Sequence, residues 1–307
     1  MLVGASLAVA ASVRTDGLGE ELDPLLGEPS PDPFVIVANG EPWLFTTNMS
    51  GLNVPVSSAA AADEPAADAL PQLPPWAAPG RTWAPAVGRG DGEWVLAFSA
   101  HHRASGRQCI GVATATEVAG PYAPRPEPLV CDVEAGGAID PSFVTGVDGT
   151  PWLLWKADGN CCGLPTRIWS AQLTSDRTAL AGQPAPLLDA DLPWEEGLVE
   201  APSMARVGDR WLLLYSGNRF EDARYAIGAA WCLTPGGPCT KIGDPVLASG
   251  LDHAGPGGAE VVRGAKAPPT VVFHAWEPGT TDRDGSTRTL HAREIVVEGD
   301  VPRLAGL

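Results

Sequence analysis

Residues 199–218 read VEAPSMARVGDRWLLLYSGN, and residues 139–160 read IDPSFVTGVDGTPWLLWKADGN. Each stretch places an acidic residue shortly before a proline and continues with an apolar run. A turn of Gly and Asp follows, and then a second apolar run that begins with Trp. A strand, a tight turn and a second strand are typical of a β-hairpin. The chain therefore repeats one hairpin, with Asp140 in the first copy and Glu200 in the second.

The hairpin pattern occurs five times along the chain. The copies cover residues 32–48, 83–99, 139–155, 200–218 and 255–276, and their prolines are Pro33, Pro85, Pro141, Pro202 and Pro256. Further strand-like runs, such as CIGVATA and YAIGAAWC, follow the hairpins. A period of roughly 50–60 residues that carries about four strands is the signature of a propeller blade. We predict an all-β fold, a five-bladed β-propeller with about four antiparallel strands per blade, over residues 21–307.

Two segments fall outside this repeat. Residues 1–20 contain a short apolar run of small residues, and we interpret them as a signal-peptide remnant or a disordered N-terminus. This run is too short to span a bilayer. Residues 57–80 are rich in Ala and Pro, and we predict a long loop between blades, with at most one helical turn.

The negative net charge of the chain argues against some classes of binding partner. The formal net charge is −17, which repels phosphate backbones, so nucleic acid is a poor partner and a neutral substrate is compatible. With 44% hydrophobic residues the chain can bury a core, and we expect a monomer.

The six cysteines favour disulfides and secretion. No CxxC pair occurs, which argues against zinc. Cys109–Cys131 and Cys232–Cys239 are plausible local pairs, while Cys161 and Cys162 could bridge each other or stay free. Disulfides persist in oxidising compartments. The alternative is six reduced, buried thiols.

The residues just before the anchoring prolines are expected to meet at one mouth of the central channel, because the first strand of each blade lies nearest the axis. These residues are Asp32, Trp83 with Ala84, Asp140, Glu200 and Gly255. Carboxylates gathered in one pocket raise each other's pKa. A glycosidase uses such a pair, one carboxylate to activate water and one carboxylic acid to protonate the leaving oxygen. Alternatively, each acid is an ordinary turn residue.

The ordered motifs DPF, IDPS and EAPS resemble those that open blades one, three and four in glycoside hydrolase family 43, over about residues 32–293. Members of that family are five-bladed propellers that cleave arabinose- or xylose-containing polysaccharides with inversion. The resemblance implies that Asp32 is the general base and Glu200 the general acid. It also implies that Asp140 orients Glu200 and keeps its pKa high.

One motif departs from the family pattern. Many relatives carry Gly-Pro-Gly-His at the start of blade five, and that His helps hold a metal or water on the axis. This chain has Gly258 in its place. We therefore expect no required cofactor, with an axial calcium or sodium as the alternative. His253 and His274 are candidates to fill the space, although a His in the apolar run VVFHAW is as readily a hydrogen-bonded core residue.

Four residues are expected to contact substrate: Arg288, Trp83, Trp194 and His274. Arg288 resembles a family arginine near the active centre, and its alternative is a solvated surface charge. Trp83 and Trp194 offer large aromatic faces on which sugars stack. Trp152, Trp155 and Trp211 lie in strand interiors and are expected to fill space between blades.

Together these features predict a secreted hydrolase of plant-type pentose polymers or oligomers. Arabinan or arabinofuranosyl side chains are the first choice, and xylosides the second. Two alternatives stay open, a propeller lectin that binds sugar without cleaving it and an enzyme for another furanoside, such as a fructan or galactofuranoside.

Overall fold

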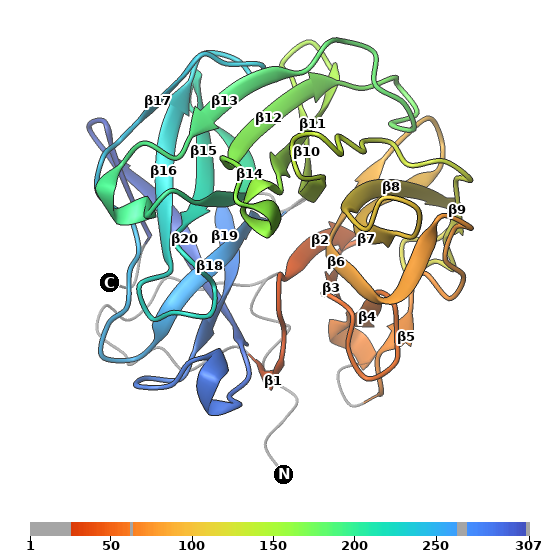
Figure 1. Ribbon diagram of the computed structural model, residues 1–307, viewed down its shortest axis with the longest axis horizontal. Helices are drawn as coiled ribbons and strands as arrows, with labels where there is room; N and C mark the ends of the chain where they lie inside the picture. The colour runs from red at the N-terminus through yellow and green to blue at the C-terminus, as the bar shows by residue number, and fades with distance from the viewer. Residues whose placement is uncertain (1–25, 62–63, 263–268, 305–307) are drawn as a thin grey trace.

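A computed structural model describes residues 26–61, 64–262 and 269–304. The interpretation of residues 1–20 lies outside these residues. The described chain forms five antiparallel sheets arranged in chain order around an axis (Figure 1). The first strands of neighbouring sheets contact one another, and the contact between β18 and β2 closes the ring. The predicted five-bladed propeller is confirmed.

Each of the first four blades has four strands. Blade one contains β2 (Phe34–Ala38), β3 (Glu41–Phe45), β4 (Pro55–Ser58) and β5 (Ala67–Asp68). Blade two contains β6 (Ala77–Arg89), β7 (Trp94–His102), β8 (Gln108–Ala115) and β9 (Ala123–Pro124). Blade three contains β10 (Ala138–Thr145), β11 (Pro151–Ala157), β12 (Arg167–Gln172) and β13 (Ala185–Asp189). Blade four contains β14 (Val199–Val207), β15 (Arg210–Gly217), β16 (Ala226–Cys232) and β17 (Cys239–Lys241).

Blade five is closed by the N-terminal strand. Its strands β18 (Ala254–Val261), β19 (Thr270–Trp276) and β20 (Thr289–Glu298) are followed by β21 (Val301–Leu304). The strand β1 (Leu26–Pro29) pairs antiparallel with β20, and β21 pairs with β20 as well. The two ends of the chain therefore meet in one sheet, which protects an edge that would otherwise stay open.

Short 3₁₀ helices interrupt the loops. They are η2 (Ala59–Ala61), η3 (Gly159–Cys162), η4 (Pro193–Glu195) and η5 (Asp282–Asp284). The prediction of a loop over residues 57–80 was wrong in part, because the end of β4, all of β5 and the start of β6 lie there, whereas η2 agrees with the single helical turn that was allowed. Its Ala and Pro residues concealed the outer strands of blade one, which are only two to four residues long.

The second strand of each hairpin carries the core. In β15 every residue after Arg210 is buried, and all of β19 is buried. A strand that packs between two neighbouring sheets has no solvent face, which explains why these runs are apolar without alternation. Trp155 and Trp211 are buried, and Trp152 packs against the same core as Trp211.

All six cysteines form disulfides. The predicted pairs Cys109–Cys131 and Cys232–Cys239 are present, and Cys161 is bonded to Cys162. Within the described residues, no helix has the length and apolar character needed to cross a membrane.

Candidate active site

A backbone irregularity recurs at the channel mouth in every blade. The first and second strands lose register between Trp83 and Ala86, and again at the matching place in blades three, four and five. In blades two to five, one residue at each break has a left-handed φ. In blade one the corresponding residue lies just before β2, and the five φ values range from 45° to 61°. These residues are Asp32, Ala84, Asp140, Ala201 and Gly258. Such bulges re-aim side chains, and non-glycine residues in this conformation concentrate at functional sites.

This pattern corrects two expectations about which positions match. Glu200 precedes the left-handed residue of its blade, Ala201, so it corresponds to Ile139 and not to an Asp-Pro aspartate. In blade five the matching residue is Gly258 rather than Gly255, because the register break surrounds Gly258. The prolines also lie inside the first strands of blades two to five, not at their starts. The sequence shows a proline but not the bulge around it, so the offset was not visible.

The three acids line one cavity of about 390 Å³. Five of the seven predicted site residues lie on its wall: Asp32, Trp83, Asp140, Glu200 and Arg288. A smaller axial cavity of about 30 Å³ lies between the bulges of all five blades and is also lined by Asp32 and Asp140. That volume is enough for about one water molecule. Glu200 lines the larger cavity but not the axial one.

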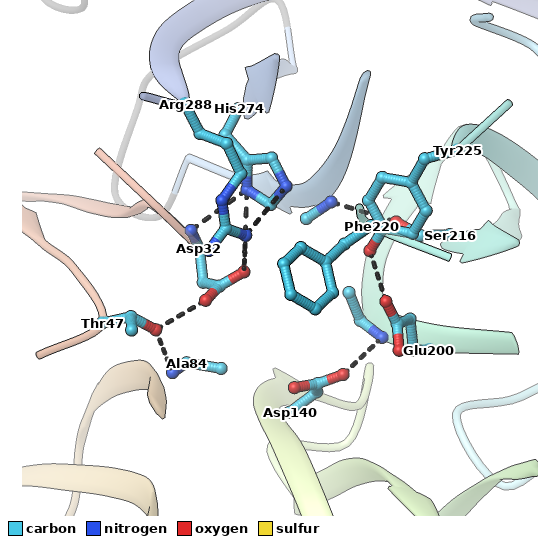
Figure 2. A network of polar contacts seen from close by, with 12 residues as sticks. Asp32, Thr47, Ala84, Asp140, Glu200, Ser216, Phe220, Tyr225, His274 and Arg288 are labelled. Carbon is cyan, nitrogen blue, oxygen red and sulfur yellow. Dashed lines mark hydrogen bonds and ion pairs between the residues drawn. The ribbon is translucent and has the colours of Figure 1, made fainter. Parts of the chain in front are cut away.

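Asp32 is held by groups from blades one and five (Figure 2). The Thr47 hydroxyl donates to Oδ2 at 2.6 Å, and Arg288 Nη1 donates to Oδ1 at 3.3 Å. Burial raises the pKa of Asp32, but the guanidinium of Arg288 and the bond from Thr47 outweigh it, so the pKa lies below its ordinary value. Asp32 is therefore ionised at neutral pH.

Asp140 and Glu200 form a second group between blades three and four. Glu200 Oε2 accepts from Lys156 Nζ at 2.7 Å, and Oε1 accepts from the Tyr225 hydroxyl at 2.7 Å. Asp140 Oδ2 accepts the Ala201 N–H at 2.9 Å. Burial, and then the charge of Glu200, raise the pKa of Asp140 to about 8. Asp140 therefore retains a proton at neutral pH, so the site that it shares with Glu200 holds a proton of the kind that acid catalysis needs.

His274 lies beneath Asp32 rather than on the cavity wall. Its side chain is fully buried, and Nδ1 accepts the Asp32 N–H at 3.1 Å. Burial, and then Arg288, lower the pKa of His274 to about 3, so the ring is neutral. A Cβ on Gly258 would stand 2.5 Å from the His274 ring. His274 therefore occupies the space beside the glycine and contacts the backbone of Asp32.

The residues present do not fit a histidine-held ion on the axis. Gly258 has no side chain, and His274 Nδ1 is already engaged by the Asp32 N–H, while Nε2 lies 3.3 Å from the Arg288 guanidinium. Over the described ranges, the only group of His, Cys, Asp and Glu atoms close enough to share a metal is His102 with the Cys109–Cys131 disulfide. We derive no catalytic step through a metal.

The two candidate tryptophans lie in different places. Trp83 is on the cavity wall. The Trp194 ring stacks on Tyr215 at 5.8 Å, and its Nε1 donates to the Gly243 carbonyl at 2.8 Å. Trp194 is not among the residues that line the cavity, so we do not propose a sugar contact for it.

The residues of the cavity wall that sequence reasoning missed include Lys156, Tyr225 and Phe220. The Arg288 guanidinium lies over the Phe220 ring at 4.9 Å, which holds the arginine toward Asp32. Lys156 carried a signal, since it is the one charged residue in the apolar run WLLWKA. The other two lie in or after the β15–β16 loop, whose path no strand pattern predicts.

The sequence model of one family, Glycosyl hydrolases family 43, matches residues 22–301. The chain belongs to this family. Among curated proteins, the extracellular endo-α-(1→5)-L-arabinanase 1 of Bacillus subtilis (strain 168) is 26% identical over an alignment of 213 residues, and the match covers 64% of this chain. The chain spans about three fifths of that relative's length, 61%.

Solved structures of other proteins share the fold. A thermostable family-43 glycoside hydrolase superposes with a TM-score of 0.81 at 23% identity, covering 94% of this chain and 96% of that one. An endo-1,4-β-xylanase from Bacteroides thetaiotaomicron VPI-5482 gives a TM-score of 0.75 at 24% identity, covering 91% and 95%.

Proposed function

We propose that the protein is an inverting glycosidase that hydrolyses arabinofuranosyl linkages of arabinan-type polysaccharides, with Asp32 as general base and Glu200 as general acid. The observation that carries the proposal is the contrast among three carboxylates in one cavity. Asp32 is ionised beside a cation, whereas Asp140 and Glu200 share a buried site that retains a proton. An inverting glycosidase needs one carboxylate of each kind on opposite sides of the scissile bond.

The proposed reaction is a single displacement. A water molecule attacks the anomeric carbon and gives a proton to Asp32 as the glycosidic bond breaks. The leaving oxygen takes a proton from Glu200 and departs as the hydroxyl of the product. Asp32 then returns its proton through water, and the Asp140–Glu200 pair is reprotonated.

The cavity lining favours Glu200 over Asp140 as the proton donor. Glu200 lines only the larger cavity, where a sugar fits, while Asp140 also lines the water-sized axial cavity. Asp140 Oδ2 accepts the N–H of Ala201, the residue that follows Glu200. Asp140 is therefore placed to orient Glu200 and to hold the proton within the pair.

Arabinan is the preferred substrate class because the curated relative is named for that activity. Xylosides remain the second choice, in keeping with a structural relative named as a xylanase. We also propose secretion, because three disulfides need an oxidising compartment and the Bacillus relative is named as extracellular.

The test is hydrolysis of linear 1,5-α-L-arabinan, 4-nitrophenyl α-L-arabinofuranoside and 4-nitrophenyl β-D-xyloside by the wild type and by Asp32→Ala. We expect turnover of an arabinose substrate that the variant loses, and proton NMR of the first product should show the inverted anomer. A retained anomer would contradict the single displacement. Folded wild type that cleaves none of the three would contradict the substrate class and favour a sugar-binding role.

A further inference from the structure

The bulge amides reveal a repeated hydrogen bond between neighbouring blades. In each blade the N–H of the left-handed residue leaves the sheet and donates to a side chain on the previous blade. Ala84 donates to Thr47 at 2.9 Å and Asp140 to Ser99 at 3.1 Å. In the same way, Gly258 donates to Ser216 at 3.0 Å, and Asp32 to His274 at 3.1 Å. We call these bonds the blade clasps.

The clasp acceptors occupy one structural position. Ser99, Ser216 and His274 pair across the sheet with Trp83, Glu200 and Gly257, the residues that directly precede the bulges. Thr47 follows β3 and serves blade two in the same way. In blade three the pairing partner of Ile139 at this position is Lys156.

Lys156 cannot serve as a clasp acceptor. An ammonium group has three donors and no acceptor. The Ala201 N–H therefore donates to Asp140 Oδ2 at 2.9 Å. Among the five clasps, this is the one whose acceptor is a carboxylate, and that carboxylate belongs to the bulge residue of blade three. A hydroxyl in place of Lys156 would accept the Ala201 N–H, as Ser99 in blade two and Ser216 in blade four accept the bulge amides of the next blade. The lysine is therefore not needed for the clasp.

The position of the ammonium group shows what Lys156 does instead. Lys156 has a side chain only 1% exposed, with Nζ 2.7 Å from Glu200 Oε2 and 3.4 Å from Asp158 Oδ1. A buried cation is costly unless carboxylates surround it. Here burial lowers the pKa of Lys156, but Glu200, Asp140 and Asp158 outweigh it and the net pKa is raised, so the group stays charged.

We propose that Lys156 is a positioning residue for acid catalysis, which holds Glu200 in place and supplies the single positive charge that leaves the Asp140–Glu200 pair with one proton. This inference rests on the proposed function. Asp32 has its own cation in Arg288. With one proton in the pair, Lys156 balances the remaining negative charge beside it.

Other charged and titratable groups face the pair or line the same cavity. They are Asp32 from blade one, Asp158 from blade three, Tyr225, Arg219 and Glu221 from blade four and Arg288 from blade five, with Arg107 of blade two acting on Asp158. Of the cations, Lys156 is the one in contact with Glu200 in the described structure. Its removal is therefore expected to dominate any change in the pair's titration.

The test compares Lys156→Met with the wild type on two substrates that differ in their leaving group. A 1,5-linked arabino-oligosaccharide needs a strong acid, and a 4-nitrophenyl arabinofuranoside needs little help. We expect kcat to fall about 100-fold or more on the oligosaccharide and less than about tenfold on the aryl glycoside. The basic limb of the pH profile should move up by about one unit or more, since loss of a nearby cation favours the protonated pair.

Two further variants separate this role from a structural one. Lys156→Arg keeps the charge and should keep the basic limb near its wild-type position. Ser216→Ala removes a clasp without removing a charge and should leave the limb where it is. Equal losses of kcat on both substrates with an unmoved limb would overturn the proposal. If Lys156→Met does not fold, Lys156→Gln offers the Ala201 N–H an acceptor and is subject to the same expectations.

An infrared titration makes the test independent of turnover. The protonated carboxyl band should disappear near pH 8 in the wild type and at higher pH in Lys156→Met. If the wild type cleaves no substrate, the proposed function fails while this shift still supports or overturns the role of Lys156. An identical titration in both proteins would overturn it.

Discussion

Two junctions between blades present buried carboxylates to the same cavity, and they shift the carboxylate pKa in opposite directions. Where blades five and one meet, Asp32 accepts hydrogen bonds from Arg288 and Thr47, and its pKa is lowered despite its burial. Where blades three and four meet, Asp140 lies beside Glu200, and its pKa is raised to about 8. Burial raises the pKa in both places, so the neighbouring charges decide the outcome.

The junctions also differ in how they clasp the backbone. His274 accepts the Asp32 N–H as a neutral ring, so no carboxylate takes part in this clasp. Lys156 offers no acceptor, so the carboxylate of Asp140 takes over the clasp. The two junctions therefore differ at one repeated position and present an ionised carboxylate on one side of the cavity and a protonated Asp140 on the other.

Loss of the base should have the largest effect. Asp32→Asn keeps the size of the side chain but cannot take a proton from water, so kcat should fall about 10²- to 10⁴-fold. Steady-state kinetics on arabinan would measure the loss, with thermal unfolding as the control for folding. A decrease below tenfold would mean that Asp32 is not the base.

Loss of the cation beside the base should shift the pH profile. In Arg288→Met the pKa of Asp32 should rise, because the guanidinium that offsets most of the effect of burial would be lost, and the acidic limb should move up by about one to two units. Arg288→Lys retains a positive charge and should move the limb less. An unmoved acidic limb in the methionine variant would contradict the assignment.

Crowding His274 should disturb the clasp of Asp32. A Cβ at residue 258 would stand 2.5 Å from the His274 ring, so Gly258→Ala must displace that ring. We expect roughly a tenfold lower kcat and a loss of about 1–3 kcal/mol in unfolding free energy.

Gly208→Ala is the matched control for Gly258→Ala. Gly208 also has a positive φ, 64°, but a Cβ there meets nothing within 4 Å. The control should lose stability from backbone strain alone and keep its kcat. Equal kcat values in the two variants would contradict a role for His274 in holding Asp32.

The smallest effect is expected at the tryptophans. Trp83→Ala removes an aromatic face from the cavity wall and should raise KM about three- to tenfold. Trp194→Ala should lower stability with little change in KM, because that ring packs on Tyr215. A higher KM in the Trp194 variant alone would reverse this distinction.

The sequence predicted the blades well because strand and turn signals are local. Asn39–Gly40 and Asp148–Gly149 form the hairpin tips that the pattern indicated. The closing strand β1 was not predicted, since its partner β20 lies at the other end of the chain. Short outer strands within residues 57–80 carried no apolar repeat.

For the site, the sequence motifs identified three acids that line the cavity, but not their surroundings. The one-residue offset of Glu200 follows from a bulge, and a proline in the sequence does not distinguish a bulge from a strand start. Lys156 and Tyr225 reach Glu200 from a neighbouring strand and a loop, so only the fold brings them together. Trp194 lies close to Glu200 in sequence, yet its ring points to Tyr215.

The most direct test of the contrast between the two junctions is the pH dependence of kcat/KM for the wild type. We expect a bell-shaped pH profile. Activity should be lost on the acid side only below the ordinary carboxylate range near pH 4, as Asp32 becomes protonated, and on the basic side near pH 8, as the Asp140–Glu200 pair loses its proton. A profile that stays flat from pH 6 to beyond pH 9 would contradict it. So would an acidic limb centred near pH 6 that moves on substitution of Asp32.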